Sequence, residues 1–365
     1  MIIESLLYIA VASQILYYGL LLFKVILSRQ STKVDNYHNK GVSVIICARN
    51  ERENLKNNLP KVLSQDYPVF EVIVVNDAST DDSWKVLQEL RSKDERLRVI
   101  NIPLEEKSTI GKKGALQCGI SHARYPYLLL TDADCYPTSQ LWINKMTAQF
   151  SEEVELVLGV SPYEHKGRFL HDIVTYETLL TMLQYTGWAL WNLPYMGVGR
   201  NIAYTKSLYD RVGGMKSHMN LASGDDDLFV QEAIQETSVA VCFDPLSHTL
   251  SAPPSTFKSW WNQKKRHYTT GHQYLLKHRL ILGFFLISKL TVYISFLLLI
   301  KYWSLPILLT YVFYLSTITL FSWVFAKKYQ LLSVNIVKFC ILDLLYVCTV
   351  LIQGFQSKTN AKNQW

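Results

Sequence analysis

Acidic side chains are nearly absent from both ends of this 365-residue chain. It contains 30 Asp and Glu residues, yet only Glu4 lies before residue 35 and only Asp343 lies after Asp244. Ends of this kind do not suit a protein that is soluble throughout, and here they are also strongly apolar. The sequence therefore predicts a soluble middle between two membrane-embedded ends.

Several other features are missing. None of the six cysteines forms a CxxC pair, and no metal-site spacing is present, so we expect the thiols to be small buried hydrophobes in a reducing compartment. The first residues lack Lys and Arg, and no small-x-small site follows the first apolar run, which argues against a cleaved signal peptide. There is also no internal repeat and no low-complexity segment.

Four apolar stretches are long enough to cross a bilayer, which takes roughly 20 residues. They cover residues 6–27, 281–300, 305–326 and 336–354, and Asp343 interrupts the last, which could instead be re-entrant. The predicted organisation is an N-terminal membrane helix at 1–28, a soluble domain at 29–255, an amphipathic interfacial segment at 256–280, about three membrane helices within 281–356, and a tail at 357–365.

Basic residues near the ends of the spans predict their orientation. Arg29 and Lys33 follow the first span, and six basic residues between positions 258 and 279 precede the second. Both groups belong to the soluble middle, which we therefore place in the cytoplasm, on a multi-pass protein of the inner (plasma) membrane. The net charge of +7 gathers mainly at these flanks, where membrane lipids explain it, so no nucleic-acid partner is expected.

The soluble middle alternates buried apolar runs with helical segments. The runs at 42–47, 72–75, 97–102 and 127–131 predict strands, and helices are expected at 49–64, 81–93 and 113–123. This alternation predicts an α/β fold with a mostly parallel sheet and helices on both faces. Ligands of such sheets bind beyond the carboxyl ends of the strands.

Polar residues follow three of these strands at their carboxyl ends. Asn50 and Glu51 come after the first strand, Asp77 after the second, and the triplet Asp132-Ala133-Asp134 after 127–131. They should therefore converge on one edge of the sheet. Two carboxylates one residue apart can hold a divalent cation against a diphosphate, which indicates a nucleotide-activated substrate.

Together these features resemble the membrane-anchored family-2 glycosyltransferases with the GT-A fold, the superfamily of cellulose, hyaluronan and poly-N-acetylglucosamine synthases. The matching segments occur in the family's order and cover about residues 42 to 270. They are Ala48-Arg49-Asn50-Glu51, Val75-Asn76-Asp77-Ala78-Ser79, Gly111-Lys112 with Ala115-Leu116, Thr131-Asp132-Ala133-Asp134, Gly199-Arg200-Asn201-Ile202-Ala203-Tyr204, Ser223-Gly224-Asp225-Asp226-Asp227-Leu228 and Gln263-Lys264-Lys265-Arg266-His267.

The resemblance implies a donor site for a nucleotide-sugar, with a UDP-sugar expected. Asp77 would accept a hydrogen bond from the base or the ribose. Lys112 would approach the phosphates, although a solvent-exposed lysine is the plainer interpretation, and Glu51 could equally be a first-turn helix residue. The residues expected on the donor side are Ala48, Arg49, Glu51, Asp77, Lys112, Asp132 and Asp134.

The resemblance also implies a metal, Mg²⁺ or Mn²⁺, that bridges the diphosphate and neutralises charge on the leaving nucleotide. Asp134 is the favoured direct ligand, and Asp132 contacts either the metal or the ribose. The alternative to a metal site is that Asp132 and Asp134 simply belong to a polar turn at the end of a strand.

Sugar transfer with inversion needs a base for the acceptor hydroxyl. Alignment of Asp227-Leu228 with the family's pattern makes Asp225 the base, with Asp226 as the alternative, and at least one of the three aspartates should cap the following helix.

Gln263 and Arg266 would share one helix face, and Arg266 would stabilise the departing diphosphate.

For other segments, a structural or membrane-anchoring role stands beside a functional one. Lys264 and Lys265 would serve as a basic membrane flank, and Arg200-Asn201 would line the acceptor side. The helical segment 169–193 either packs in the core or forms an acceptor groove. Aromatic residues beside the basic cluster are expected to anchor at the bilayer interface. These are Trp260, Trp261 and Tyr268.

We therefore expect an inverting, metal-dependent glycosyltransferase that acts on a lipid or a lipid-linked glycan. His267 stands where polymerising relatives often have Trp, which favours single addition. The alternatives are a processive polysaccharide synthase that works with partner subunits and a non-catalytic membrane scaffold.

Overall fold

The computed structural model describes residues 2–28, 40–107, 111–164, 167–221, 223–267, 269–302, 304–331 and 338–356. Two compact units make up the chain. The sheet unit comprises Arg29–Glu164, Pro194–Pro253 and Ala361–Trp365, and the helical unit comprises Met1–Ser28, His165–Leu193 and Pro254–Asn360. Arg29, Lys33 and Tyr268, which the sequence analysis singles out, lie outside the described residues.

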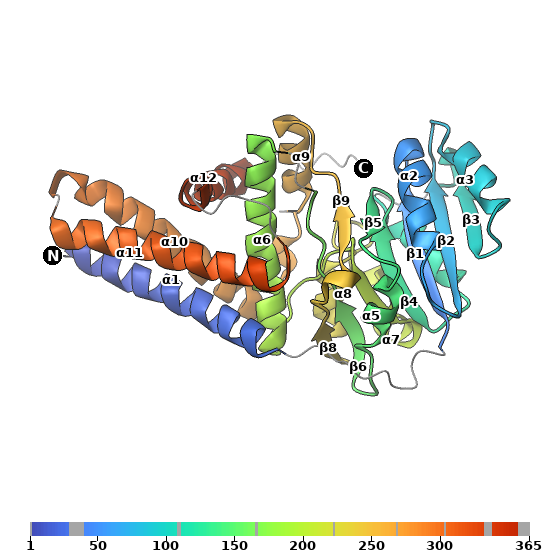
Figure 1. The fold of residues 1–365 in the computed structure, drawn as a ribbon, viewed down its shortest axis with the longest axis horizontal. Helices are drawn as coiled ribbons and strands as arrows, with labels where there is room; N and C mark the ends of the chain where they lie inside the picture. The colour runs from blue at the N-terminus through green and yellow to red at the C-terminus, as the bar shows by residue number, and fades with distance from the viewer. Residues whose placement is uncertain are drawn as a thin grey trace. The chain divides into compact units, whose positions relative to one another are not determined.

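The sheet unit is built on a seven-stranded sheet with the order β3-β2-β1-β4-β7-β6-β8 (Figure 1). Strands β3, β2, β1 and β4 are parallel, whereas β7 is antiparallel to both β4 and β6. The expectation of a mostly parallel sheet is therefore confirmed. The strands are β1 Val42–Ala48, β2 Phe70–Asp77, β3 Leu97–Ile102, β4 Tyr127–Asp132, β6 Val154–Leu158, β7 Ile202–Thr205 and β8 Ser238–Val241, and a separate pair is formed by β5 Cys135–Pro137 and β9 Thr249–Ser251.

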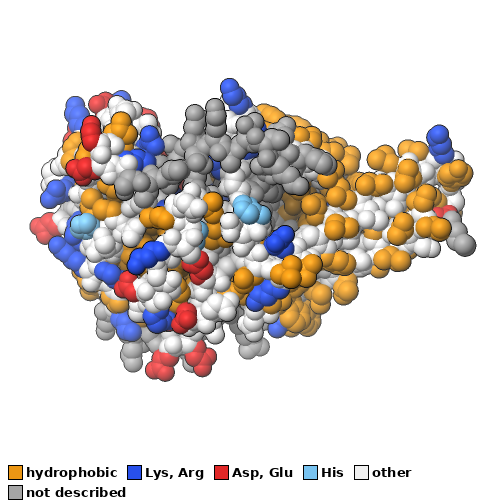
Figure 2. All heavy atoms as spheres, turned by 180° about the vertical axis from the view of Figure 1, so that it is seen from behind, with side chains coloured by type: hydrophobic (Ala, Val, Ile, Leu, Met, Phe, Trp, Pro, Cys, Tyr) orange, Lys and Arg blue, Asp and Glu red, His pale blue; other side chains and the backbone are white. Residues whose placement is uncertain are grey.

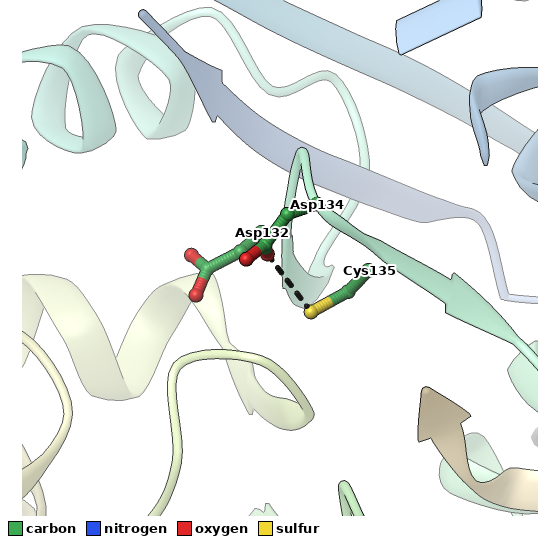
Figure 3. A group of neighbouring side chains, drawn as sticks. All are labelled: Asp132, Asp134 and Cys135. Atoms are coloured by element: carbon green, nitrogen blue, oxygen red, sulfur yellow. Dashed lines mark hydrogen bonds between the residues drawn. The ribbon is translucent and has the colours of Figure 1, made fainter. Parts of the chain in front are cut away.

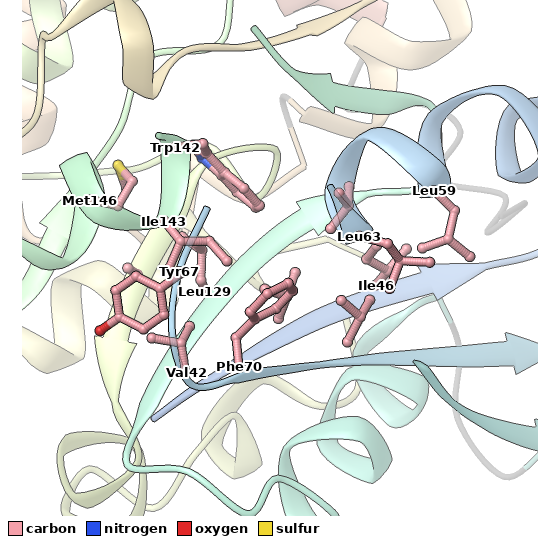
Figure 4. Packing of buried hydrophobic residues seen from close by; sticks show 14 of the residues in the cluster. Val42, Ile46, Leu59, Leu63, Tyr67, Phe70, Leu129, Trp142, Ile143 and Met146 are labelled. Carbon is pink, nitrogen blue, oxygen red and sulfur yellow. The ribbon is translucent and has the colours of Figure 1, made fainter. Parts of the chain in front are cut away.

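Helices cover both faces of this sheet because its central strands are apolar on both sides. On one face, Ile46 of β1 packs in a cluster with Leu59 and Leu63 of α2 (Figure 4). On the other face, a side chain at Gly119 of α4 would lie 2.8 Å from Ile45, so the glycine allows a close approach of helix and strand. The helices are α2 Arg52–Leu63, α3 Ser83–Arg91, α4 Lys113–Ser121, α5 Trp142–Thr147, α7 Lys206–Arg211 and α8 Asp227–Ala233.

The strand register brings the predicted polar clusters to one edge. Ala48 at the end of β1 pairs with Asn76 of β2, and Cys47 pairs with Asp132 of β4. Because the three strands are parallel neighbours, the segments that follow them leave the sheet side by side. The convergence expected from the sequence is confirmed.

The helical unit contains α1 Ile2–Leu27, α6 Phe169–Leu190, α9 Phe257–His267, α10 Leu276–Leu299, α11 Leu305–Lys328 and α12 Phe339–Gln356. Among the described residues, three stretches are long and apolar enough to cross a membrane, namely Ile2–Leu27, Leu276–Tyr302 and Leu305–Lys328. Figure 2 shows apolar side chains gathered over these helices. Large apolar residues exposed on them include Ile9 of α1, Ile287 of α10 and Phe313 of α11. The shorter α12 carries Asp343, and whether it spans the membrane stays a prediction.

Helix α6 belongs to the helical unit, although it lies in the middle of the sequence that supplies the sheet. A side chain at Gly187 would lie 2.9 Å from Leu21 of α1, and the indole of Trp191 donates to the carbonyl of Leu20. Most residues of α6 are buried, and such a helix needs neighbours on every side. The contacts of segment 169–193 with α1 are therefore those expected of a helix packed in the core.

Candidate active site

The carboxylates of Asp132 and Asp134 flank the turn between β4 and β5, at the edge where the strands converge (Figure 3). One ligand atom from each, together with the Sγ of Cys135, lie within 4.8 Å of one another. Burial, together with the neighbouring Asp132, raises the pKa of Asp134, and the thiol of Cys135 donates to it. A divalent cation would offset the repulsion, and an oxygen-rich donor set at a sheet edge fits Mg²⁺ or Mn²⁺.

The ammonium of Lys112, at the start of α4, joins this edge to the acidic segment before α8. Its Nζ lies 2.9 Å from Asp132 and 2.7 Å from Asp225. Burial by itself lowers the pKa of Lys112, but the carboxylates around it raise the pKa well above its usual value. A side chain at Gly199 would lie 2.9 Å from this Nζ and 3.3 Å from Asp225, so the glycine leaves room for the cluster.

The three consecutive aspartates have different environments. Asp226 caps α8, because its carboxylate accepts from the backbone N–H groups of Asp227 and Gly199 at 2.8 and 2.9 Å. Burial and the adjacent charges of Asp225 and Asp227 raise its pKa to about 7. The cap expected from the sequence is thus Asp226, whereas Asp225 contacts Lys112. This arrangement favours Asp225 as the base, an assignment that stays a prediction.

On the donor side, Asp77 is buried and its carboxylate lies 2.5 Å from Lys107. Lys107 is a partner of Asp77 that nothing local in the sequence marks. It could have been found only from the pairing of β2 with β3, which places Asp77 opposite Ile102 and so near the segment that follows β3.

Ala48 and Arg49 leave the sheet at the end of β1, and Glu51 follows them. Burial raises the pKa of Glu51, and the charges of Asp134 and Asp132 add to this effect, so Glu51 faces the same edge. The side-chain oxygen of Asn50 accepts from the backbone N–H of Thr80, which ties the segment after β1 to the segment after β2. Donor contacts by these residues stay predictions.

Arg200 and Asn201 were both expected on the acceptor side. Burial by itself lowers the pKa of the Arg200 guanidinium, but Tyr163 first and then Asp134 and Asp132 raise it above its usual value. The guanidinium stacks 4.3 Å over the ring of Tyr163. Asn201 is fully buried, and its amide donates to the carbonyls of Val160 and Ser247. Asn201 is therefore a structural residue of the core, because it has no exposed surface for an acceptor.

Gln263 and Arg266 lie on α9, in the helical unit, and their roles stay predictions. The same helix corrects two simpler expectations. Lys264 is not merely a basic flank, because its ammonium lies 2.9 Å from the buried carboxylate of Glu177 in α6. Trp260 is not an interfacial anchor, because its ring is only 1% exposed and its N–H donates to Glu177.

Comparisons with known proteins identify the sequences and the fold that this chain resembles. Residues 43–217 match the model of the glycosyl transferase family 2. The chain is 27% identical over 252 residues to the probable glycosyltransferase YdaM of Bacillus subtilis, covering 64% of this chain and 56% of that protein. It is 24% identical over 249 residues to the poly-beta-1,6-N-acetyl-D-glucosamine synthase of Staphylococcus epidermidis, covering 67% and 58%. The matches thus span little more than half of these relatives.

A solved structure is similar over nearly the whole chain. It is the mannosyltransferase PcManGT from Pyrobaculum calidifontis, in complex with GDP-Man and Mn²⁺, with a TM-score of 0.64 and 17% identity. The alignment covers 98% of this chain and 100% of that one. Residues 43–217 are therefore similar to the family 2 glycosyltransferases, and the fold around them is of the GT-A type.

Proposed function

We propose that the protein transfers a sugar, with inversion and with a divalent metal, from a nucleotide-sugar to a hydroxyl group of a lipid or lipid-linked glycan. The observation that carries this proposal is the position of Lys112. Its ammonium lies between Asp132, in the triplet Asp132-Ala133-Asp134 (the DxD pair), and Asp225, which precedes α8. One ammonium thus contacts a carboxylate of the expected metal site and the expected base. The three long apolar helices favour an acceptor at the cytoplasmic face of the plasma membrane.

Asp134 and Asp132 are the residues that would hold Mg²⁺ or Mn²⁺. Bound there, the ion would neutralise charge on the nucleotide diphosphate as it departs. Asp225 takes the proton of the acceptor hydroxyl as the oxygen attacks the anomeric carbon, and the bond to the diphosphate breaks. Lys112 contacts the Asp225 carboxylate at 2.7 Å and would orient it toward the acceptor hydroxyl. Arg266, supported by Gln263, is proposed to stabilise the leaving diphosphate.

The donor is proposed to be a UDP-sugar, as the resemblance to the synthases suggests. The similar mannosyltransferase was solved with GDP-Man, so GDP-sugars are the alternative. On the donor side, Asp77 is the residue proposed to contact the base or the ribose, and Lys107 would orient its carboxylate.

A processive polysaccharide synthase is the second candidate. It is favoured by the similarity to the poly-beta-1,6-N-acetyl-D-glucosamine synthases. The length of the product separates the two: a ladder of long products supports the synthase, and one added sugar supports single transfer.

The experiment is release of nucleoside diphosphate by the detergent-purified protein, with a panel of UDP- and GDP-sugars, total membrane lipid as acceptor, and Mn²⁺, Mg²⁺ or EDTA. We expect release with one donor that EDTA and Asp134→Ala abolish. The matched control is Asp66→Ala, because Asp66 is exposed and lies outside the site. Release that survives both EDTA and Asp134→Ala would refute the metal role. Absence of release with every donor, with no cellular effect of Asp134→Ala, would favour a non-catalytic scaffold.

A further inference from the structure

Lys113 follows Lys112 in the sequence but has a different environment. Its side chain is fully buried, and its Nζ donates to the backbone carbonyl of His218 at 2.6 Å. The same Nζ lies 2.8 Å from the Nδ1 of His218. An ammonium group is only a donor, so Nδ1 must accept and the proton of the neutral imidazole must be on Nε2.

His218 belongs to a single helical turn, η3 Lys216–His218, on the path from α7 to α8. Its side chain is 4% exposed. Burial, together with the adjacent Lys113, lowers the pKa of His218 to about 4, so the imidazole is neutral at physiological pH and keeps the acceptor that Lys113 needs. The carbonyl of His218 also accepts from the backbone N–H of Leu221 at 3.1 Å, so Lys113 contacts a point that organises the turn.

Helix α8 holds the same turn from the other side. The hydroxyl of Ser217 donates to the carboxylate of Glu232, and the Nε2 of His218 lies 3.8 Å from that carboxylate. Glu232 is on α8, and the N-terminal end of this helix begins at Asp226 and Asp227. The turn therefore connects the start of α4 to the helix that follows the proposed base.

Lys113 also lies against the backbone next to the proposed base. A side chain at Gly224 would lie 3.3 Å from its Nζ, and Gly224 has a φ of +106°, a conformation that strongly favours glycine. Asp225 is the next residue. Consecutive lysines thus lie against one segment in two ways: Lys112 contacts the Asp225 carboxylate, and Lys113 lies beside Gly224 and donates to His218.

We propose that Lys113 and His218 form a latch that positions Asp225 for proton abstraction without touching the substrates. The inference rests on the proposed role of Asp225 as the base. A buried ammonium with two donor contacts to one residue restrains both position and direction, and displacement of a catalytic group by about 1 Å can cost on the order of 100-fold in rate. Lys113 and His218 are therefore positioning residues.

The first test combines hydrogen–deuterium exchange with kinetics on the full-length protein in detergent. In Lys113→Met we expect faster exchange in the peptides that contain Lys216–His218 and Gly224–Asp226. We expect a fall in kcat of about 10- to 100-fold, with the KM for the donor changed by less than about threefold. Lys85→Met is the matched control, because Lys85 is exposed on α3.

Variants of His218 test the latch independently, should Lys113→Met not fold. His218→Asn keeps an acceptor near the position of Nδ1 and should remain within about threefold of the wild-type kcat, whereas His218→Leu should resemble Lys113→Met. Adding His218→Leu to Lys113→Met should cost little more than either change alone, because both remove the same contact.

Three results would overturn the latch: unchanged exchange in both peptides, faster exchange with an unchanged kcat, or additive losses in the double variant. Exchange does not depend on catalysis. If the wild-type protein turns over no donor, the proposed function fails, and the exchange data still decide whether Lys113 and His218 hold the segment.

Discussion

Lys289 of α10 and Asp343 of α12 form an ion pair in which both side chains are fully buried, with 2.5 Å between Nζ and Oδ1. The hydroxyls of Tyr176 and Tyr293 donate to the same carboxylate at 2.6 and 2.5 Å. Asp343, which interrupts an apolar stretch of the sequence, therefore accepts from Lys289, Tyr176 and Tyr293. Since they come from α6 and α10, this cluster joins α12 to two other helices of its unit.

Removal of one partner of this pair should destabilise the helical unit. Asp343→Leu leaves the Lys289 ammonium buried without its counter-ion, and such losses cost about 3–5 kcal/mol. We expect a lower midpoint of thermal unfolding in detergent for Asp343→Leu and for Lys289→Met, followed by circular dichroism. The double variant should lie closer to the wild type than either single variant. Lys277→Met, at an exposed position of α10, is the control, and equal losses in all the variants would contradict the argument.

Substitution of each aspartate by asparagine distinguishes the two candidate bases, Asp225 and Asp226. Asp225→Asn should lower kcat by about 100- to 10,000-fold, because the acceptor hydroxyl loses its base. Asp226→Asn keeps a side-chain oxygen for the cap and should cost about tenfold or less. The measurement is kcat with the preferred donor, beside calorimetric binding of the nucleotide. The assignment is reversed if Asp226→Asn is the more damaging change while nucleotide binding persists.

The raised pKa of Asp226 predicts a pH dependence of stability. Its pKa is about 7 in the folded protein and 3.8 when unperturbed, so the folded state binds the proton more tightly. The resulting stabilisation is complete below about pH 4 and is lost as the pH rises through 7. Thermal unfolding of the metal-free protein between pH 5 and pH 8 should show this decline. In Asp226→Asn the decline should be smaller, and an identical decline would show that other groups cause it.

Under the proposed function, Lys112 and the cation would compete for the Asp132 carboxylate. Removal of the ammonium in Lys112→Met should therefore strengthen Mn²⁺ binding in the absence of nucleotide, because a carboxylate is released from its ion pair. Sugar transfer should nevertheless fall by about 10- to 100-fold, since Asp225 loses the same partner. Titration of Mn²⁺ by electron paramagnetic resonance, beside kcat, checks both. Weaker Mn²⁺ binding in Lys112→Met would mean that Lys112 supports the metal site.

Much of the fold could be predicted from the sequence because its signals are local. Three of the predicted strands end in a polar cluster, and parallel pairing then brings the ends of β1, β2 and β4 together. The DxD pair and the acidic segment before α8 are likewise contiguous motifs. The pairings Lys107 with Asp77 and Lys264 with Glu177 were missed because each joins two distant segments with no periodic or motif signal.

The sequence by itself determined the long apolar helices of the two ends, the parallel core of the sheet and the edge that carries Asp132 and Asp134, since runs of apolar residues and their polar ends dictate burial locally. Only the tertiary structure decided that Asp226 caps α8 while Asp225 contacts Lys112, and that Lys113 holds His218. Adjacent residues of one type are equivalent in a sequence. They become different only when chain packing sets which of them is buried and which partner each one faces.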